Sequence, residues 1–132
     1  RNIGIYGAAT YHSGIDIPSP EGTYFLAAMS GTVAHTGFSG SGGYTITLVN
    51  GDTKAVYCHT HPNFIVKPGD YVERSQVIGQ VGPLNVYDVL NNPYKDKNGN
   101  PTNGSTTGCH LHFSIKINGK AENPLNFVER RE

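Results

Sequence analysis

The sequence predicts a mainly β domain, and three observations lead to that fold class. Residues 110–117 alternate strictly between polar and apolar side chains, and a period of two residues is the signature of a half-buried strand. Other short runs of β-branched and aromatic residues are separated by clusters of glycine and Asn or Asp. The 132 residues include 17 Gly and 8 Pro, which favour short strands joined by turns over helices.

The expected strands are rich in side chains that suit a pleated, half-buried surface. In chain order they are residues 24–27, 31–35, 44–49, 54–59, 71–72, 77–81 and 110–117. The dipeptide Asn50-Gly51 stands between two of them and predicts a tight hairpin, because both residues readily adopt a positive φ. The glycine-rich residues 39–43 separate another pair of strands. Near the C-terminus, residues 125–130 are expected to form one helical turn.

The length of the chain indicates how many domains it forms, and its charge balance excludes some classes of function. At 132 residues the chain is expected to form a single domain, residues 1–132. Ten Lys and Arg balance ten Asp and Glu, so the chain lacks the basic surface that binds nucleic acid. No apolar run approaches the ~18 residues of a membrane span. The chain opens on Arg1, and we interpret it as a domain of a longer protein whose other domains or subunits are its partners.

Two short polar clusters, one near each end of the chain, contain residue types that bind metal ions. They are His12-Ser13-Gly14-Ile15-Asp16 and His110-Leu111-His112. His and Asp are ligands for a borderline ion such as zinc, whose catalytic sites have three protein ligands and one open position. On a strand, His110 and His112 point to the same face, about 7 Å apart. In a straight strand His12 and Asp16 would be ~13 Å apart, so the backbone is expected to bend at Gly14.

An ordinary structural role is the alternative for each cluster taken alone. An isolated H-x-H on a strand is more often a surface pair or a buried pair than a metal site. Together, and with a further H-x-H at His59-Thr60-His61, the clusters favour a metal site. Spacing alone does not separate the ligands from histidines that act on a metal-activated water.

The clusters fall within a series of six ordered motifs by which the chain resembles the lysostaphin-type zinc metallopeptidases, a family of peptidoglycan hydrolases. The matching segments are residues 12–17 (HSGIDI), 28–33 (AMSGTV), 57–60 (YCHT), 66–79 (VKPGDYVERSQVIG), 107–113 (TGCHLHF) and 123–125 (NPL). Three positions depart from the family pattern: Thr60 stands for Leu, Ser75 for Gly and Cys109 for Pro. The resemblance extends from about residue 11 to residue 128.

The resemblance implies a fold and a set of roles. The fold would be a compact antiparallel β-sheet domain whose long loops form a groove around a zinc site. His12, Asp16 and His112 would hold one Zn²⁺ ion. His59 and His110 would stand beside it as the catalytic histidines.

Two further histidines need a place in this scheme. His61 competes with His59 for the catalytic position, and His59 is preferred because Tyr57 precedes it as in the family pattern. His35 has no matching role and is expected to be an ordinary, half-exposed residue.

The implied activity is that of an endopeptidase that cuts the crosslinks or stem peptides of peptidoglycan. It would work outside the cell or on a virion. Zinc polarises a peptide carbonyl and lowers the pKa of water toward ~7. A neutral histidine can take a proton from the water, and a protonated one can stabilise the oxyanion or donate to the leaving amine. Which of His59 and His110 has which role stays open.

Each cysteine immediately precedes a proposed catalytic histidine. Alternation along a strand places neighbouring side chains on opposite faces, so Cys58 and Cys109 are expected to face away from the groove. Two small buried thiols are the expected state. A disulfide between them is the alternative.

Residues 83–106 depart from the family, which passes this point in a few residues. They include six Asn and lead directly into the strand of His110 and His112. We interpret residues 83–106 as an inserted loop near the active site, outside the core, that forms one wall of the groove. With Cys109 before the H-x-H, their composition gives a narrower resemblance to the lysin domains on tail tips of short-tailed bacteriophages, which act during infection.

Two other functions compete with this interpretation. The first is a catalytically inactive cell-wall-binding or regulatory module, because the family has members that lack ligands. The presence of all five expected polar residues argues against it. The second is a lipoyl- or biotin-carrier domain, suggested by residues 66–72 followed by Gln76. It would leave both histidine clusters unexplained.

Overall fold

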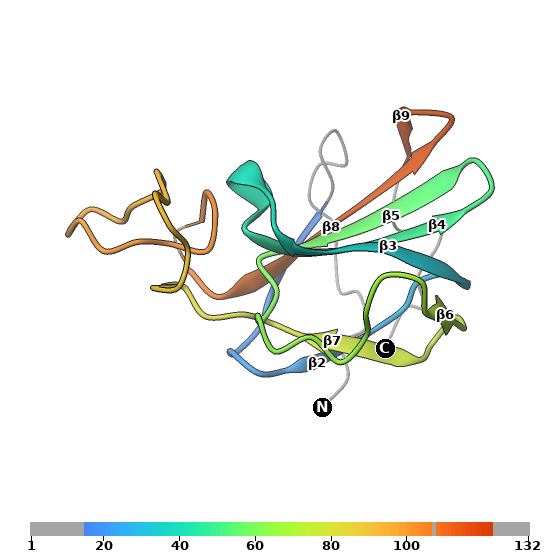
Figure 1. The fold of residues 1–132 in the computed structure, drawn as a ribbon, viewed down its shortest axis with the longest axis horizontal. Coiled ribbons are helices and arrows are strands. Elements are labelled where there is room, and N and C mark those ends of the chain that lie inside the picture. Colours follow the sequence, from blue (N-terminus) through green and yellow to red (C-terminus); the bar gives the residue numbers. More distant parts are fainter. Residues whose placement is uncertain (1–14, 107, 123–132) are drawn as a thin grey trace.

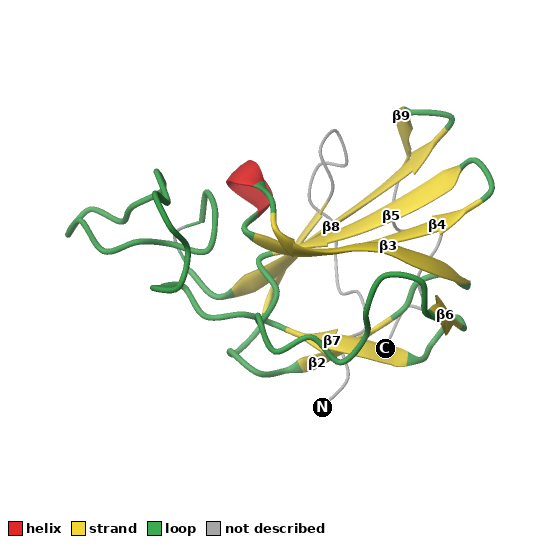
Figure 2. Cartoon of the chain, in the orientation of Figure 1, coloured by secondary structure: helices red, strands yellow, loops and turns green. Residues whose placement is uncertain are grey.

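The structure of the chain, a computed structural model, describes residues 15–106 and 108–122. The expected helical turn at residues 125–130 lies outside this range, as does His12 with the bend expected at Gly14. The described residues form two antiparallel sheets that face each other, with the small sheet below the large one in Figure 1. Figure 2 shows strands joined by loops, with one short 3-10 turn, η1 (Gly40–Gly42), so the predicted fold class is confirmed.

The spatial order of the strands differs from their order in the chain. The large sheet contains β1 (Ile15–Pro18), β8 (His110–Ile117), β5 (Thr53–Cys58), β4 (Tyr44–Asn50), β3 (Gly31–Phe38) and β6 (Tyr71–Val72), and β9 (Lys120–Glu122) pairs with β8. The small sheet consists of β2 (Tyr24–Leu26) and β7 (Val77–Gln80). The first described strand, β1, therefore lies beside the N-terminal half of β8, although almost 100 residues separate the two in sequence.

Most expected strands are found where the sequence places them. Strands β6 and β8 have the expected bounds, and β3 runs three residues further than expected, to Phe38. The predicted hairpin joins β4 to β5, where Asn50 pairs with Thr53 and Gly51 has a φ of 58°. Strands β1 and β9 were not predicted from the sequence. A hairpin signal was available for β9, because Asn118-Gly119 connects it to β8 and both residues have a positive φ.

Alternation along β8 divides the molecule into a core and an open face. Leu111, Phe113 and Ile115 are at most 3% exposed and pack between the two sheets. His110 and His112 lie on the opposite face of the strand. The side-chain pattern that identifies the strand therefore also decides which of its residues remain available for chemistry.

Tyr57 of β5 lies at the centre of the core. Its ring stacks between Phe25 of the small sheet and Phe113 of β8, with centroid distances of 5.2 and 5.0 Å. Its hydroxyl oxygen accepts a hydrogen bond of 2.9 Å from the backbone N–H of Ala28. The residue that precedes the Cys58–His59 pair is thus held on both ring faces and at its polar end.

Replacing Tyr57 by phenylalanine should destabilise the fold by about 1–3 kcal/mol, because the buried Ala28 N–H loses its acceptor. Urea unfolding followed by circular dichroism measures this change. Tyr71, whose side chain is 65% exposed on β6, provides the matched control, and Tyr71→Phe should leave the free energy of unfolding within ~0.5 kcal/mol of the wild type. Equal effects of the two substitutions would contradict the role given to the Tyr57 hydroxyl.

Across the described residues, we find no helix long and apolar enough to cross a membrane.

Candidate functional site

Strands β1 and β8 place three of the expected residues side by side. Asp16 is the register partner of His112 in this antiparallel pair. The Asp16 Oδ1 atom lies 2.7 Å from His112 Nδ1 and 3.5 Å from His110 Nε2. The two histidine side chains are 20% and 21% exposed and that of Asp16 is 56% exposed. The cluster is therefore open to solvent and to a ligand.

His59 enters the same cluster from the neighbouring strand. It follows Cys58, the last residue of β5, whose register partner is His112. The φ of His59 is 60°, an uncommon value for a residue with a Cβ. Its backbone N–H donates to Gly42 O at 2.7 Å, which helps to fix this conformation. The ring centroid of His59 lies 5.1 Å from that of His110 and 6.4 Å from that of His112.

The hydrogen bond of His59 determines which ring nitrogen can act as an acceptor. His59 Nδ1 lies 2.7 Å from the carbonyl oxygen of Asn103. A carbonyl only accepts, so Nδ1 carries the hydrogen and Nε2 of the neutral ring is left unprotonated. Burial lowers the pKa of His59 and outweighs the opposing effect of the bond to Asn103. The ring is therefore neutral near pH 7 and can accept a proton.

Asn103 anchors residues 83–106 beside the cluster. Its fully buried side chain accepts from the Tyr44 N–H at 2.8 Å and donates to Thr60 O at 3.0 Å. Gly43, with a φ of 65°, allows this close approach, because a Cβ there would collide with the Asn103 carbonyl. One polar residue thus ties the loop to β4, to the chain after β5 and to the His59 ring.

Residues 83–106 have a buried base and an exposed tip. Ser105 and Thr106 line the groove, so the end that leads into β8 lies beside the histidines as expected. The segment extends away from the two sheets in Figure 1, and its side chains Tyr87 and Leu90 are 70% and 89% exposed. The expectation that this polar segment stays outside the interior is wrong at its base. Thr102 and Asn103 are at most 1% exposed, because their polar groups are hydrogen-bonded.

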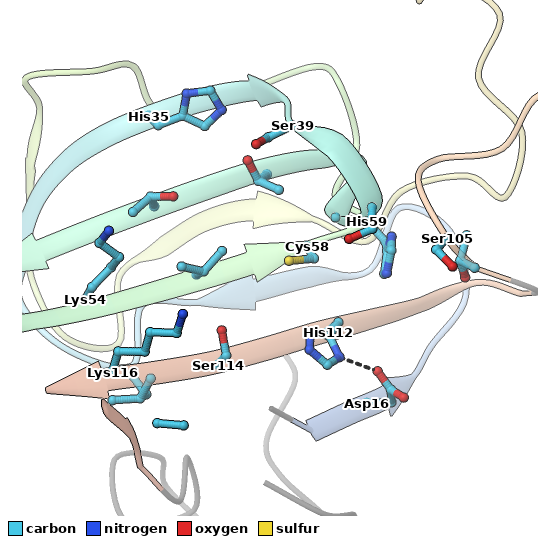
Figure 3. Close-up of a pocket in the computed structure, with 18 of the residues that line it drawn as sticks. Asp16, His35, Ser39, Lys54, Cys58, His59, Ser105, His112, Ser114 and Lys116 are labelled. Carbon is cyan, nitrogen blue, oxygen red and sulfur yellow. Dashed lines mark hydrogen bonds and ion pairs between the residues drawn. The ribbon is translucent and has the colours of Figure 1, made fainter. Parts of the chain in front are cut away.

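The cluster lies at one end of a groove of about 1240 Å³ on the open face of the large sheet (Figure 3). Strands β3, β4, β5 and β8 supply most of its lining. His59, His112 and Asp16 are grouped at one end in the figure, and Lys54 and Lys116 are at the other. A chain segment lying along the strands would contact both ends.

Four of the five predicted site residues are brought together: Asp16, His59, His110 and His112 all line this groove. The fifth, His12, lies outside the described residues. Among the residues that are described, no three His, Cys, Asp or Glu side chains are arranged to hold a metal ion.

Of the two remaining histidines, His35 lines the groove and His61 is not among the described residues that line it. The Nδ1 atom of His61 instead accepts from the Asn63 N–H at 3.1 Å. His35 is exposed and lines the groove on β3 (Figure 3).

The expected orientation of the cysteines is wrong for Cys58. Cys58 lines the groove together with His59, although the two are adjacent in sequence. The positive φ of His59 interrupts the strand alternation, so both side chains reach the same side. Cys109 is exposed rather than buried, and both thiols are free. Asn103 was not predicted as a residue of the site, because no local pattern in the sequence marks it.

The two thiols should differ strongly in reactivity. Burial raises the pKa of Cys58 to about 11, and the charge of Asp16 adds to the effect. The thiolate is the nucleophile, so iodoacetamide at pH 7.5 should alkylate Cys109 of the metal-free protein about 100-fold faster than Cys58. Peptide mass mapping over time measures both rates. The difference should vanish in denaturant, and equal rates in the folded protein would contradict the burial of Cys58.

Comparison with known proteins gives concordant matches. The profile of "Peptidase family M23" matches residues 10–93. Stage II sporulation protein Q of Bacillus subtilis is 31% identical over 119 residues, which are 89% of this chain and 36% of that protein. The peptidoglycan DD-endopeptidase ShyC of Vibrio cholerae is 27% identical over 121 residues, 91% of this chain and 23% of that protein. The chain thus spans about a third or less of these curated relatives.

A solved structure covers a comparable length. The catalytic domain of the antimicrobial peptidase lysostaphin from Staphylococcus simulans is 30% identical, with a TM-score of 0.65, over 95% of this chain and 83% of that one. The match leaves no support for the carrier-domain alternative.

Proposed function

We propose, from the premise that this chain belongs to peptidase family M23, that it is a zinc-dependent endopeptidase acting on the peptides of bacterial peptidoglycan. The observation that carries the proposal is the convergence of Asp16, His59, His110 and His112 at one end of an open groove. Three sequence segments far apart in the chain contribute these side chains. Their donor and acceptor groups are those that peptide hydrolysis at a metal requires.

The donor atoms of these residues suit a zinc ion, and the distances between pairs of the described residues can be compared with a zinc site. Two atoms that share one zinc ion each lie ~2.0–2.2 Å from it, so they are at most about 4.4 Å apart. Asp16 Oδ1 lies 2.7 Å from His112 Nδ1 and 3.5 Å from His110 Nε2, so both histidines satisfy this limit, and the family pattern selects His112 as the ligand. We assign Asp16, His112 and His12 as the ligands. This set keeps one coordination position open for water or substrate.

In the proposed peptide hydrolysis, the zinc ion and the histidines of the chain have different roles. Zinc, when bound, polarises the peptide carbonyl and lowers the pKa of water. His59, neutral and with Nε2 as its acceptor, is suited to take a proton from the attacking water. His110, whose Nδ1 lies 3.4 Å from the Thr106 hydroxyl, is suited to stabilise the oxyanion or to protonate the leaving amine.

The proposed substrate follows from the relatives and from the groove. ShyC is named for its action on peptidoglycan and lysostaphin as an antimicrobial peptidase, and an open groove suits an extended peptide chain. The site of action would be the cell wall, outside the cytoplasm, with other domains of a longer protein as partners. Action on a virion rests only on residues 83–106 and Cys109, and that part stays a prediction.

Purified peptidoglycan sacculi test the proposal. The protein should release soluble muropeptides with new amino groups, which dinitrofluorobenzene labelling and mass spectrometry identify. EDTA should abolish the release, and added zinc should restore it. Binding to sacculi without release of any amino group would establish the inactive wall-binding module instead.

A further inference from the structure

The end of the groove opposite the histidines has an unusual charge arrangement. Lys116 of β8 and Lys54 of β5 are direct register partners, and both line the groove. Antiparallel partners have Cα atoms about 4.5–5.5 Å apart, and like charges placed there repel each other. Figure 3 shows both side chains on the groove face, beyond Ser114 when viewed from His112.

No carboxylate of the described residues offsets this repulsion. Of the described side chains that line the groove, Asp16 alone carries a carboxylate, and it lies at the other end. Neither ammonium group has an ion-pair partner within the described part of the chain; the Lys–carboxylate pair found there joins Lys67 to Asp70. The sheet therefore presents two adjacent positive charges to whatever occupies the groove.

We infer that Lys54 and Lys116 form a subsite for a carboxylate of the bound peptide. A carboxylate has two oxygen acceptors, one for each ammonium, and would relieve the repulsion between them. The inference rests on the proposed function, because it assumes that the groove binds a wall peptide. Such peptides carry free carboxylates at their C-termini and side chains.

The spacing fixes where that carboxylate lies. His112 and Lys116 are four residues apart on β8, which corresponds to ~13 Å along the strand. An extended peptide advances ~3.3–3.6 Å per residue, so the carboxylate belongs about four residues from the scissile bond. The subsite would thus select peptides that extend well beyond the bond being cut.

Chemical amidation of the substrate tests the inference. Sacculi are prepared in native form and with their carboxylates converted to amides by carbodiimide and ammonium chloride. Co-sedimentation measures binding, and amino-group release measures cleavage. The wild type should bind native sacculi about tenfold more tightly than amidated sacculi, the sum of two exposed ion pairs.

Two variants separate the subsite from a general effect of charge. Lys54→Met/Lys116→Met removes both charges, keeps an unbranched side chain only one atom shorter, and should lose the preference for native sacculi. Lys120→Met is the control, because Lys120 on β9 pairs with Ile117, whose side chain has the opposite orientation to Lys116. It should retain the full preference. A double variant that still discriminates tenfold, or a control that loses the preference equally, would overturn the inference.

Raising the salt concentration tests the carboxylate subsite without any substitution. At 1 M NaCl the Debye length is ~3 Å, so the wild-type preference for native sacculi should disappear while binding to amidated sacculi changes little. An undiminished preference would also overturn the inference. The two proposals fail separately: absence of amino-group release from both kinds of sacculi refutes the peptidase, whereas lysine-independent co-sedimentation refutes the subsite.

Discussion

Replacing His59 by alanine should lower the rate of wall-peptide hydrolysis about 10²–10⁴-fold, because a positioned general base or acid contributes by that factor. The zinc content should remain at one ion per chain, since His59 is not a proposed ligand. Its Nε2 is the acceptor left free by the bond to Asn103. Amino-group release from sacculi and elemental analysis of the same sample measure the two quantities together.

His61→Ala is the matched control for this experiment. His61 lies two residues further along the chain and is not among the described residues that line the groove. Its replacement should change the rate by less than about threefold. If His61→Ala were inactive and His59→Ala active, the choice between these two histidines would have to be reversed.

Replacing His112 or Asp16 by alanine should remove the metal and with it all measurable hydrolysis. A site with three ligands binds far more weakly after losing one, and loss of a residue that merely supports a ligand already costs ~10–100-fold in affinity. Asp16 Oδ1 and His112 Nδ1 lie 2.7 Å apart, and either substitution removes one of the two proposed ligands that the structure describes. Isothermal titration of zinc into the chelated protein measures the affinity.

Ser114→Ala provides the comparison on the same strand. Ser114 follows His112 on the same face of β8 and lines the groove, but it is not a proposed ligand. The zinc affinity of the Ser114→Ala variant should equal that of the wild type. Full zinc occupancy in His112→Ala would show that the ligand set is wrong. His12→Ala, which tests the ligand outside the described residues, should behave as His112→Ala does.

Local patterns in the sequence predicted most of the large sheet. Residues 110–117 alternate in hydrophobicity and form β8 as expected. The hairpin predicted at Asn50-Gly51 is present, with Asn50 as the last residue of β4 and Gly51-Asp52 as its loop. The prediction failed where the backbone leaves its regular conformation. The left-handed φ of His59 has no signature in the sequence, and it brings His59 to the groove face that Val56 and Cys58 already share through the alternation of β5.

Polar contacts between residues far apart in the chain could not be predicted from the sequence either. Asn103 is 44 residues from His59, yet its carbonyl selects the tautomer of that ring. Nothing in an Asn-rich loop marks one asparagine as buried, because burial depends on whether Tyr44 and Thr60 supply partners. The sequence could therefore name the histidines, by resemblance to a family, but not the group that orients one of them.

The anchoring of residues 83–106 through Asn103 makes this loop modular. Its base is tied to β4 and to the chain after β5, whereas its tip, the turn at residues 97–100, is exposed. Substitutions and length changes at the tip can accumulate during evolution without disturbing the His59 ring, provided that Asn103 is kept. A designer could likewise exchange the tip to test whether it sets the choice of peptide, while the proposed catalytic residues stay unchanged.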